Sequence, residues 1–111
     1  MIDDFYWAGF NKNNSAHQAI KDFLILDVQI DPIRSDDMIS TIKKIQNGSL
    51  PNWNGGGNAY FCDIDLNGAQ LEVLLDDFDD DDIPLIPLTE LIDALSAWSA
   101  YCRKYMASSP K

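Results

Sequence analysis

Basic residues are scarce in this sequence, and a long central stretch contains none. The 111 residues include 8 Lys and Arg against 18 Asp and Glu, which gives a formal net charge of -10. No Lys or Arg occurs between Lys44 and Arg103. Because the phosphates of nucleic acids and anionic lipids would be repelled by such a chain, we expect neither nucleic acid nor a membrane as a binding partner.

Residues suited to metal binding or covalent chemistry are also few. Cys62 and Cys102 are the two cysteines, and His17 is the single histidine. The sequence therefore predicts no zinc site, no disulfide framework and no cofactor, and both cysteines are interpreted as buried thiols. No spacing links a nucleophile to a general base, so we do not expect an enzyme.

Long apolar runs and a basic leader are missing as well. The chain begins Met1-Ile2-Asp3-Asp4, and no apolar run reaches the roughly 18 residues of a membrane span. We therefore expect a cytoplasmic protein. The 46% of hydrophobic residues is enough to build a core, which predicts one domain over residues 1–111 with 107–111 as a frayed tail.

The patterning of apolar residues predicts a small α+β domain. Apolar stripes at helical spacing predict helices over 35–46 and 88–105. The aromatic segment 5–10 favours a short strand, and the Gly- and Asn-rich stretch 47–58 favours a long loop. Residues 15–31 fit a helix, a strand or both in succession.

The clearest local pattern is a β-hairpin over residues 59–76. Alternating apolar and polar residues flank Asn67-Gly68, the favoured pair of a type I′ turn. With that pair as the turn, Asp63 lies directly opposite Glu72. One face of the hairpin is apolar, so we expect a small antiparallel sheet centred on residues 59–76, with two or three helices packed on that face.

Acidic residues gather on and after this hairpin. Eleven carboxylates lie between residues 63 and 93, and like charges placed opposite each other destabilise a strand pair unless a cation neutralises them. A solvated acidic face is one interpretation, and a docking surface for a basic partner is the interpretation that we favour. The predicted binding residues are these carboxylates and nearby apolar anchors: Asp63, Asp65, Glu72, Asp76, Asp77, Asp79, Asp80, Asp81 and Asp82, with Phe61, Leu74, Phe78 and Trp53.

Calcium binding is an alternative for the same carboxylates. The stretch from Asp63 to Gly68 matches the start of an EF-hand loop, but Leu74 stands where that loop needs its bidentate Glu. No metal site is therefore predicted. A calcium-responsive module or another acidic, non-enzymatic adaptor stays open as the alternative function.

The stretch from Asp76 to Trp98 resembles the C-terminal part of bacterial immunity proteins of contact-dependent growth inhibition and related polymorphic toxin systems. An acidic turn there leads through Ile83-Pro84-Leu85 into a helix with Leu91, Ala94-Leu95 and Trp98. The resemblance implies a cytoplasmic antidote that binds the toxin domain delivered by a neighbouring cell and covers its active site. Because such toxins are often nucleases, it also implies a basic partner.

Overall fold

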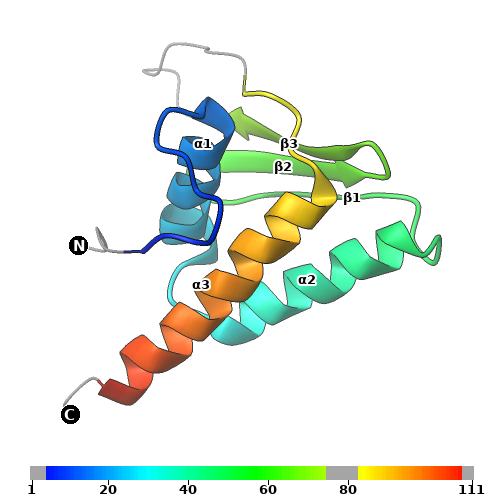
Figure 1. The fold of residues 1–111 in the computed structure, drawn as a ribbon. Coiled ribbons are helices and arrows are strands. Elements are labelled where there is room, and N and C mark those ends of the chain that lie inside the picture. The colour runs from blue at the N-terminus through cyan, green and yellow to red at the C-terminus, as the bar shows by residue number, and fades with distance from the viewer. Residues whose placement is uncertain (1–4, 75–82, 109–111) are drawn as a thin grey trace.

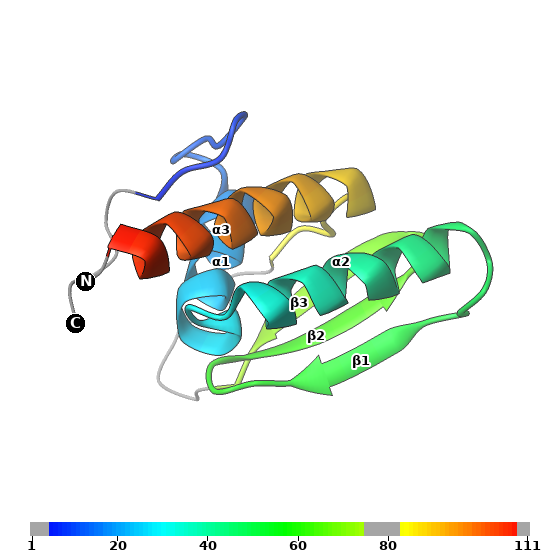
Figure 2. The ribbon, with the colours of Figure 1, turned by 90° about the horizontal axis from the view of Figure 1, so that it is seen from below.

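The computed structural model describes residues 5–74 and 83–108. They form three α-helices, one of them continued by a π-helix, and three antiparallel strands (Figure 1). The bounds are α1 Ser15–Phe23, the π-helix η1 Leu24–Val28, α2 Pro32–Gln46, β1 Trp53–Gly56, β2 Tyr60–Asp65, β3 Gly68–Val73 and α3 Leu88–Ser108. The helices lie on one side of the sheet (Figure 2), so the expected α+β class and architecture are confirmed.

Residues 15–31, for which the sequence left helix and strand open, are mainly helical. The side-chain oxygen of Asn14 caps α1 by accepting the N–H of Ala16 at 2.9 Å. The helix continues without a break into η1, where the N–H of Gln29 donates to the carbonyl oxygen of Leu24 at 2.7 Å. Gln29 ends the helix with a φ of 64°, which turns the chain toward α2.

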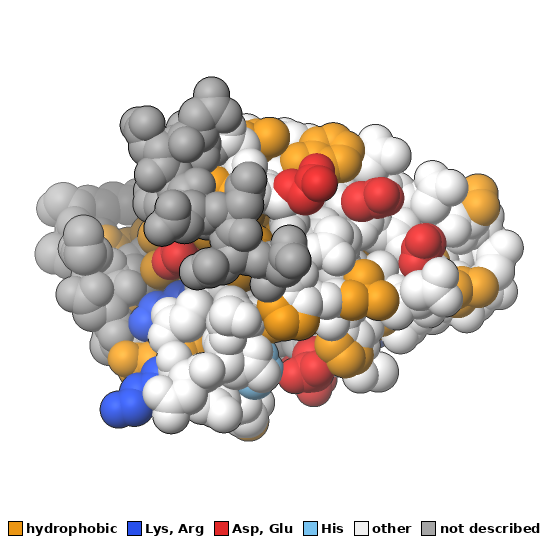
Figure 3. Space-filling model, turned by 90° about the horizontal axis from the view of Figure 1, so that it is seen from above, with side chains coloured by type: hydrophobic (Ala, Val, Ile, Leu, Met, Phe, Trp, Pro, Cys, Tyr) orange, Lys and Arg blue, Asp and Glu red, His pale blue; other side chains and the backbone are white. Residues whose placement is uncertain are grey.

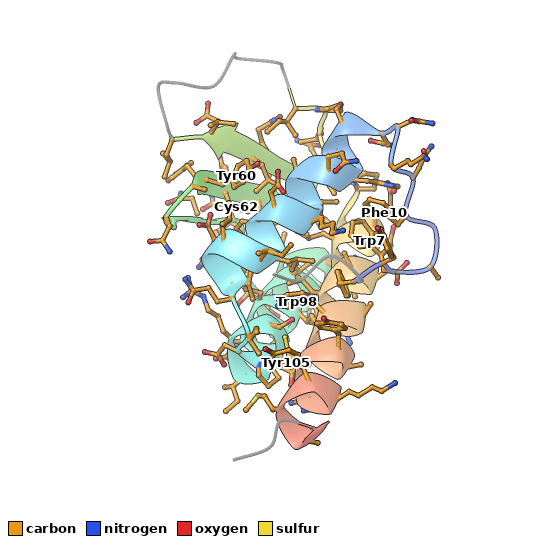
Figure 4. All side chains as sticks on the ribbon, turned by 90° about the vertical axis from the view of Figure 1, so that its left-hand side faces the viewer. Trp7, Phe10, Tyr60, Cys62, Trp98 and Tyr105 are labelled. Carbon is orange, nitrogen blue, oxygen red and sulfur yellow. The ribbon has the colours of Figure 1, made fainter. Side chains whose placement is uncertain are left out.

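The short strand expected at residues 5–10 is not formed. Phe5 and Trp7 are buried, and the ring of Phe5 packs edge-on against Trp98 of α3 with the centroids 4.9 Å apart. Trp7 packs on Phe10 in the same way (Figure 4). The aromatic residues of this segment therefore contribute apolar area to the core and do not pair with the sheet.

Helix α2 begins before the expected start at residue 35. Asp31 is its N-cap and accepts the N–H of Arg34 at 3.1 Å, and Pro32 occupies the first turn, where its missing N–H is not needed. Ser35 is buried instead, and its hydroxyl donates to the carbonyl oxygen of Leu95 on α3 at 2.8 Å. This bond fixes α2 against α3.

A polar group at the surface joins the same two helices. Asp36 of α2 accepts the guanidinium of Arg103 at 2.6 Å and the hydroxyl of Ser99 at 2.7 Å, both from α3. Arg103 also donates to the hydroxyl oxygen of Ser99. The Arg103 hydrogen bond, followed by that of Ser99, lowers the pKa of Asp36.

The sheet has the order β1–β2–β3, and its hairpin differs in register from the prediction. Asp65 pairs with Gly68, so the loop is Leu66-Asn67 and not Asn67-Gly68. Gly68 has a φ of 145°, and a Cβ there would lie 2.7 Å from the carbonyl oxygen of Ile86. Glycine is thus needed as the first residue of β3, and the two-residue shift leaves each side chain on its expected face.

The inner face of the sheet and the helices share one core. Cys62, Ile64 and Leu71 of the sheet are buried with Ile42 and Ile45 of α2. The apolar stripe predicted for α3 is buried at Leu88, Leu91, Leu95, Trp98 and Cys102. Its other two members are Ile92, which is half-buried, and Tyr105, which is 48% exposed.

Candidate protein-binding surface

The outer face of the sheet is turned away from the helices (Figure 2). Alternation along the strands places on it Asn54, Gly56, Phe61, Asp63, Asp65, Gln70 and Glu72. The three acidic side chains are exposed, whereas Phe61 is half-buried. The structure therefore brings three of the predicted carboxylates together with one of the predicted apolar anchors.

The predicted opposition of Asp63 and Glu72 is wrong, because it rested on the wrong register. Asp63 lies between the amide side chains of Asn54 on β1 and Gln70 on β3, and Glu72 lies opposite Phe61. The two carboxylates become diagonal neighbours, for which Cα atoms are roughly 7–8 Å apart. The hairpin therefore needs no bound cation to offset a direct repulsion.

The carboxylates of the outer face also have no basic partner among the described residues. Asp36 pairs there with Arg103, and Glu90 accepts a hydrogen bond from the ring of His17, both away from this face. Seen from above, acidic side chains are interspersed with hydrophobic ones, and Lys and Arg appear toward one end only (Figure 3). This part of the surface is consequently negative and partly apolar.

Two predicted apolar anchors differ in position from the expectation. Leu74, 47% exposed, follows β3 and is held by a hydrogen bond from its N–H to the carbonyl oxygen of Ala59 at 2.9 Å. It is diagonal to Phe61 and not directly opposite it, since Phe61 pairs with Glu72. Trp53 is half-buried on the inner face of β1, so it is not part of the acidic surface.

The remaining predicted binding residues, Asp76, Asp77, Phe78 and Asp79 to Asp82, lie outside the described residues. The residues that flank them are both attached to the sheet. Leu74 is bonded to Ala59, and the carbonyl oxygen of Ile83 accepts the side-chain amide of Gln70 at 2.7 Å.

Asp27 is a buried carboxylate that the sequence analysis did not single out. Its Oδ1 accepts the N–H groups of Asn58 and Ala59 at 2.7 and 2.8 Å, and its Oδ2 accepts that of Tyr60 at 2.9 Å. Gly57 lies against it so closely that a Cβ there would be 2.5 Å from the Asp27 Cγ. The one signal in the sequence is an Asp within the apolar run 23–28. Asp27 thereby builds the β1–β2 turn.

His17 was also without a predicted role, and it is buried in the N-terminal half. Its Nδ1 accepts the N–H of Asn11 at 2.9 Å, so the neutral ring carries its proton on Nε2, which donates to Glu90 Oε1 at 2.9 Å. Its ring packs against Trp7 and Phe10. His17 thus links the N-terminal segment to α3 as a structural residue.

The two cysteines are buried thiols, as the sequence predicted. Burial, with a smaller contribution from Asp63, raises the pKa of Cys62 to about 12. Burial likewise raises the pKa of Cys102. Both groups stay protonated at neutral pH, which makes them poor nucleophiles.

Metal ligation finds little support within residues 5–74 and 83–108. No group of three or more His, Cys, Asp or Glu side chains is arranged there to hold an ion. Asp65 of the EF-hand-like stretch instead accepts the N–H of Asn67 at 2.8 Å within the hairpin loop.

Comparisons with known proteins identify no relative. No family model matches the chain, and neither the curated proteins nor the solved structures include a match. Within the part of the chain that the structure describes, no helix combines the length and hydropathy required to cross a membrane.

Proposed function

We propose that this protein binds and neutralises a basic toxin domain, as a cytoplasmic immunity protein. The observation that supports this proposal is the outer face of the sheet. Asp63, Asp65 and Glu72 are exposed there without a basic partner in the described chain, around the half-buried ring of Phe61. An apolar group inside a charged surface is a common arrangement at protein interfaces.

The outer-face carboxylates favour a protein partner because of the electric field that they create. No two of these carboxylates stand directly opposite each other, and none has a basic partner in the described chain, so they neither stabilise the sheet through ion pairs nor require a cation. They do create a negative field, and such a field accelerates encounter with a positive surface and selects against negative ones. A basic partner is the ligand that this field favours.

The resemblance of residues 76–98 to immunity proteins is the reason for proposing that the basic partner is a toxin domain. A nuclease toxin exposes a basic groove for the phosphates of its substrate. An acidic face that covers this groove excludes the substrate by occupying its place. The inhibition needs no catalysis by this chain.

A pair of charge reversals tests the proposal. Asp63→Lys changes the outer face, and Asp93→Lys makes the same change in net charge at an exposed position of α3. The partner is the protein encoded immediately upstream in the source genome, recovered with the full chain as bait. We expect Asp63→Lys to slow association roughly tenfold at an ionic strength of about 0.01 M, and Asp93→Lys to have a much smaller effect.

Salt provides the internal control. At about 1 M ionic strength the screening length falls to roughly 3 Å, so the two variants should then associate at similar rates. Equal slowing by both variants at low salt would place the interface away from the outer face. Recovery of a partner without a basic surface would contradict the toxin assignment itself.

A further inference from the structure

A pocket of about 190 Å³ lies on the inner side of the sheet, between the edge strand β1 and α2. Its lining is mainly apolar and comes from Phe23, Val28, Met38, Trp53 and Ile64. The buried carboxylate Asp27 and exposed Arg34 and Asp37 also contribute to it. An apolar cavity of about 150 Å³ accommodates benzene, so this pocket suits one large apolar side chain better than a metabolite.

The strand that forms one wall of this pocket also has an open edge. The N–H of Gly57 donates to the carbonyl oxygen of Tyr60 at 2.9 Å, and bonded pairs alternate along an antiparallel ladder. Trp53 and Gly55 therefore bond to β2, while the main-chain groups of Asn54 and Gly56 point outward. Neither of these two N–H groups bonds to another residue of the described chain. Such an edge is a template for an added strand.

The pocket and the edge together determine what kind of strand fits. In a strand paired with β1, alternate side chains point to the two faces of the sheet. Those on the inner side reach the pocket. Those on the outer side pass Asn54 and Gly56 toward Asp63, which pairs with Asn54 and is exposed. A Lys or Arg at these outer positions is the complementary charge.

We propose that β1 and this pocket bind an extended segment of a partner protein, in which a large apolar residue fills the pocket and basic residues alternate with it. In this mode, main-chain hydrogen bonds provide affinity and the alternate side chains provide specificity. The inference goes beyond the proposed function and does not depend on it. It rests on the pocket beside β1 and on the unpaired edge of β1, and it holds whether or not a partner binds the outer face.

A second copy of this chain fits the edge less well. Its β1 would present Asn54, Gly55 and Gly56, none of which fills an apolar pocket, while its Trp53 already lines its own pocket. Pairing of two β1 edges would also join two acidic outer faces into one continuous sheet. The repulsion between them opposes that assembly.

The test uses a synthetic peptide, Lys-Val-Lys-Phe-Lys-Val-Lys, titrated into the isotopically labelled full chain and followed by nuclear magnetic resonance. We expect the main-chain resonances of Asn54 and Gly56 and the indole resonance of Trp53 to shift together. Replacing the Phe of the peptide with Ala, or its Lys residues with Glu, should weaken binding at least tenfold. A peptide methylated at the nitrogens that face β1 should lose binding without any change to the protein.

A matched pair of variants tests the edge from the protein side. Asn54→Pro removes an outward donor that the β1–β2 ladder does not use, and proline is tolerated at such edge positions. Asn54→Thr keeps the donor. We expect at least a tenfold loss of peptide affinity for Asn54→Pro alone. The melting temperatures of both variants, measured separately, serve as the control for folding.

Three results would overturn the proposal. The first is the absence of these shifts up to millimolar peptide, and the second is equal binding of the unmodified and the methylated peptide. The third comes from sedimentation of the chain alone. A dimer that Asn54→Pro converts to a monomer would assign the edge to a second copy.

Discussion

The two faces of the sheet are built from the same strands and have opposite properties. On β2, Cys62 and Ile64 are each 1% exposed and pack under the helices. Their neighbours Asp63 and Asp65 point to the other face, where no described element covers them. Along β2, residues adjacent in the sequence therefore lie either in the core or at the surface, according to whether their position is even or odd.

This contrast teaches that the stability of the protein and the charge of its surface are separable. The inner face contributes buried apolar area, and the outer face contributes carboxylates whose direct opposition is avoided by the register. Substitutions on the inner face should thus change the free energy of unfolding, whereas substitutions on the outer face should change the dependence of binding on charge and salt. The following predictions run from the largest expected effect to the smallest.

The largest effect on the free energy of unfolding is expected from replacing the buried carboxylate of Asp27. Asp27→Ala leaves the N–H groups of Asn58, Ala59 and Tyr60 without their acceptor. We expect a loss of about 4 kcal/mol in the free energy of unfolding, measured by urea denaturation. A loss below about 1 kcal/mol would show that water replaces the carboxylate and that the turn does not depend on it.

A substitution pair on β3 compares the faces directly. Leu71→Ala removes a fully buried side chain and should lower the free energy of unfolding by about 3 kcal/mol. Glu72→Ala, the next residue, is exposed and should change it by less than about 0.5 kcal/mol. Comparable losses in urea denaturation would mean that the outer face also stabilises the fold.

Alkaline pH should destabilise the inner face through Cys62. Its pKa rises from 9.0 to about 12 in the folded state, so its contribution to stability is complete below pH 9 and is lost as the pH rises toward 12. At pH 10 the loss is roughly 1 kcal/mol. Unfolding measured at pH 8 and pH 10 should show a smaller difference for Cys62→Ala, in which this titration is absent.

The smallest effect on stability is expected for the outer face. The double variant Asp63→Asn, Glu72→Gln keeps the shape of the side chains and should leave the melting temperature nearly unchanged at moderate salt. A rise of several degrees at low salt, suppressed at high salt, would instead measure repulsion between these diagonal carboxylates. Calorimetry at two salt concentrations separates the two outcomes.

Regular periodicity made much of this fold predictable. The alternation in the hairpin assigned each side chain to its face, and that assignment survived the error in register because the shift was two residues. The apolar stripe of α3 was equally visible, since its members recur at helical spacing. Both features are local, and local patterns are what a single sequence displays.

Tertiary contacts account for what the sequence did not predict. Strand β1 contains Gly55 and Gly56, residues with low strand propensity, and it forms because Asp27 builds the turn that returns the chain to β2. The residues 5–10 have high strand propensity, yet Phe5 is buried against Trp98. In the candidate site, the sequence did not indicate on which face of the sheet Trp53 lies, because that face depends on the pairing of β1.

The anchoring of the β1–β2 turn by Asp27 also has a consequence for the order of folding. The β2–β3 hairpin closes through a two-residue loop. The β1–β2 turn, in contrast, forms its hydrogen bonds only when Asp27 is in place, and Asp27 lies 31 residues before Asn58 in the sequence. Loop closure over that separation is slower and costs more entropy. Strand β1 should therefore join the sheet last, and its amides should exchange with solvent deuterium before those of β2 and β3.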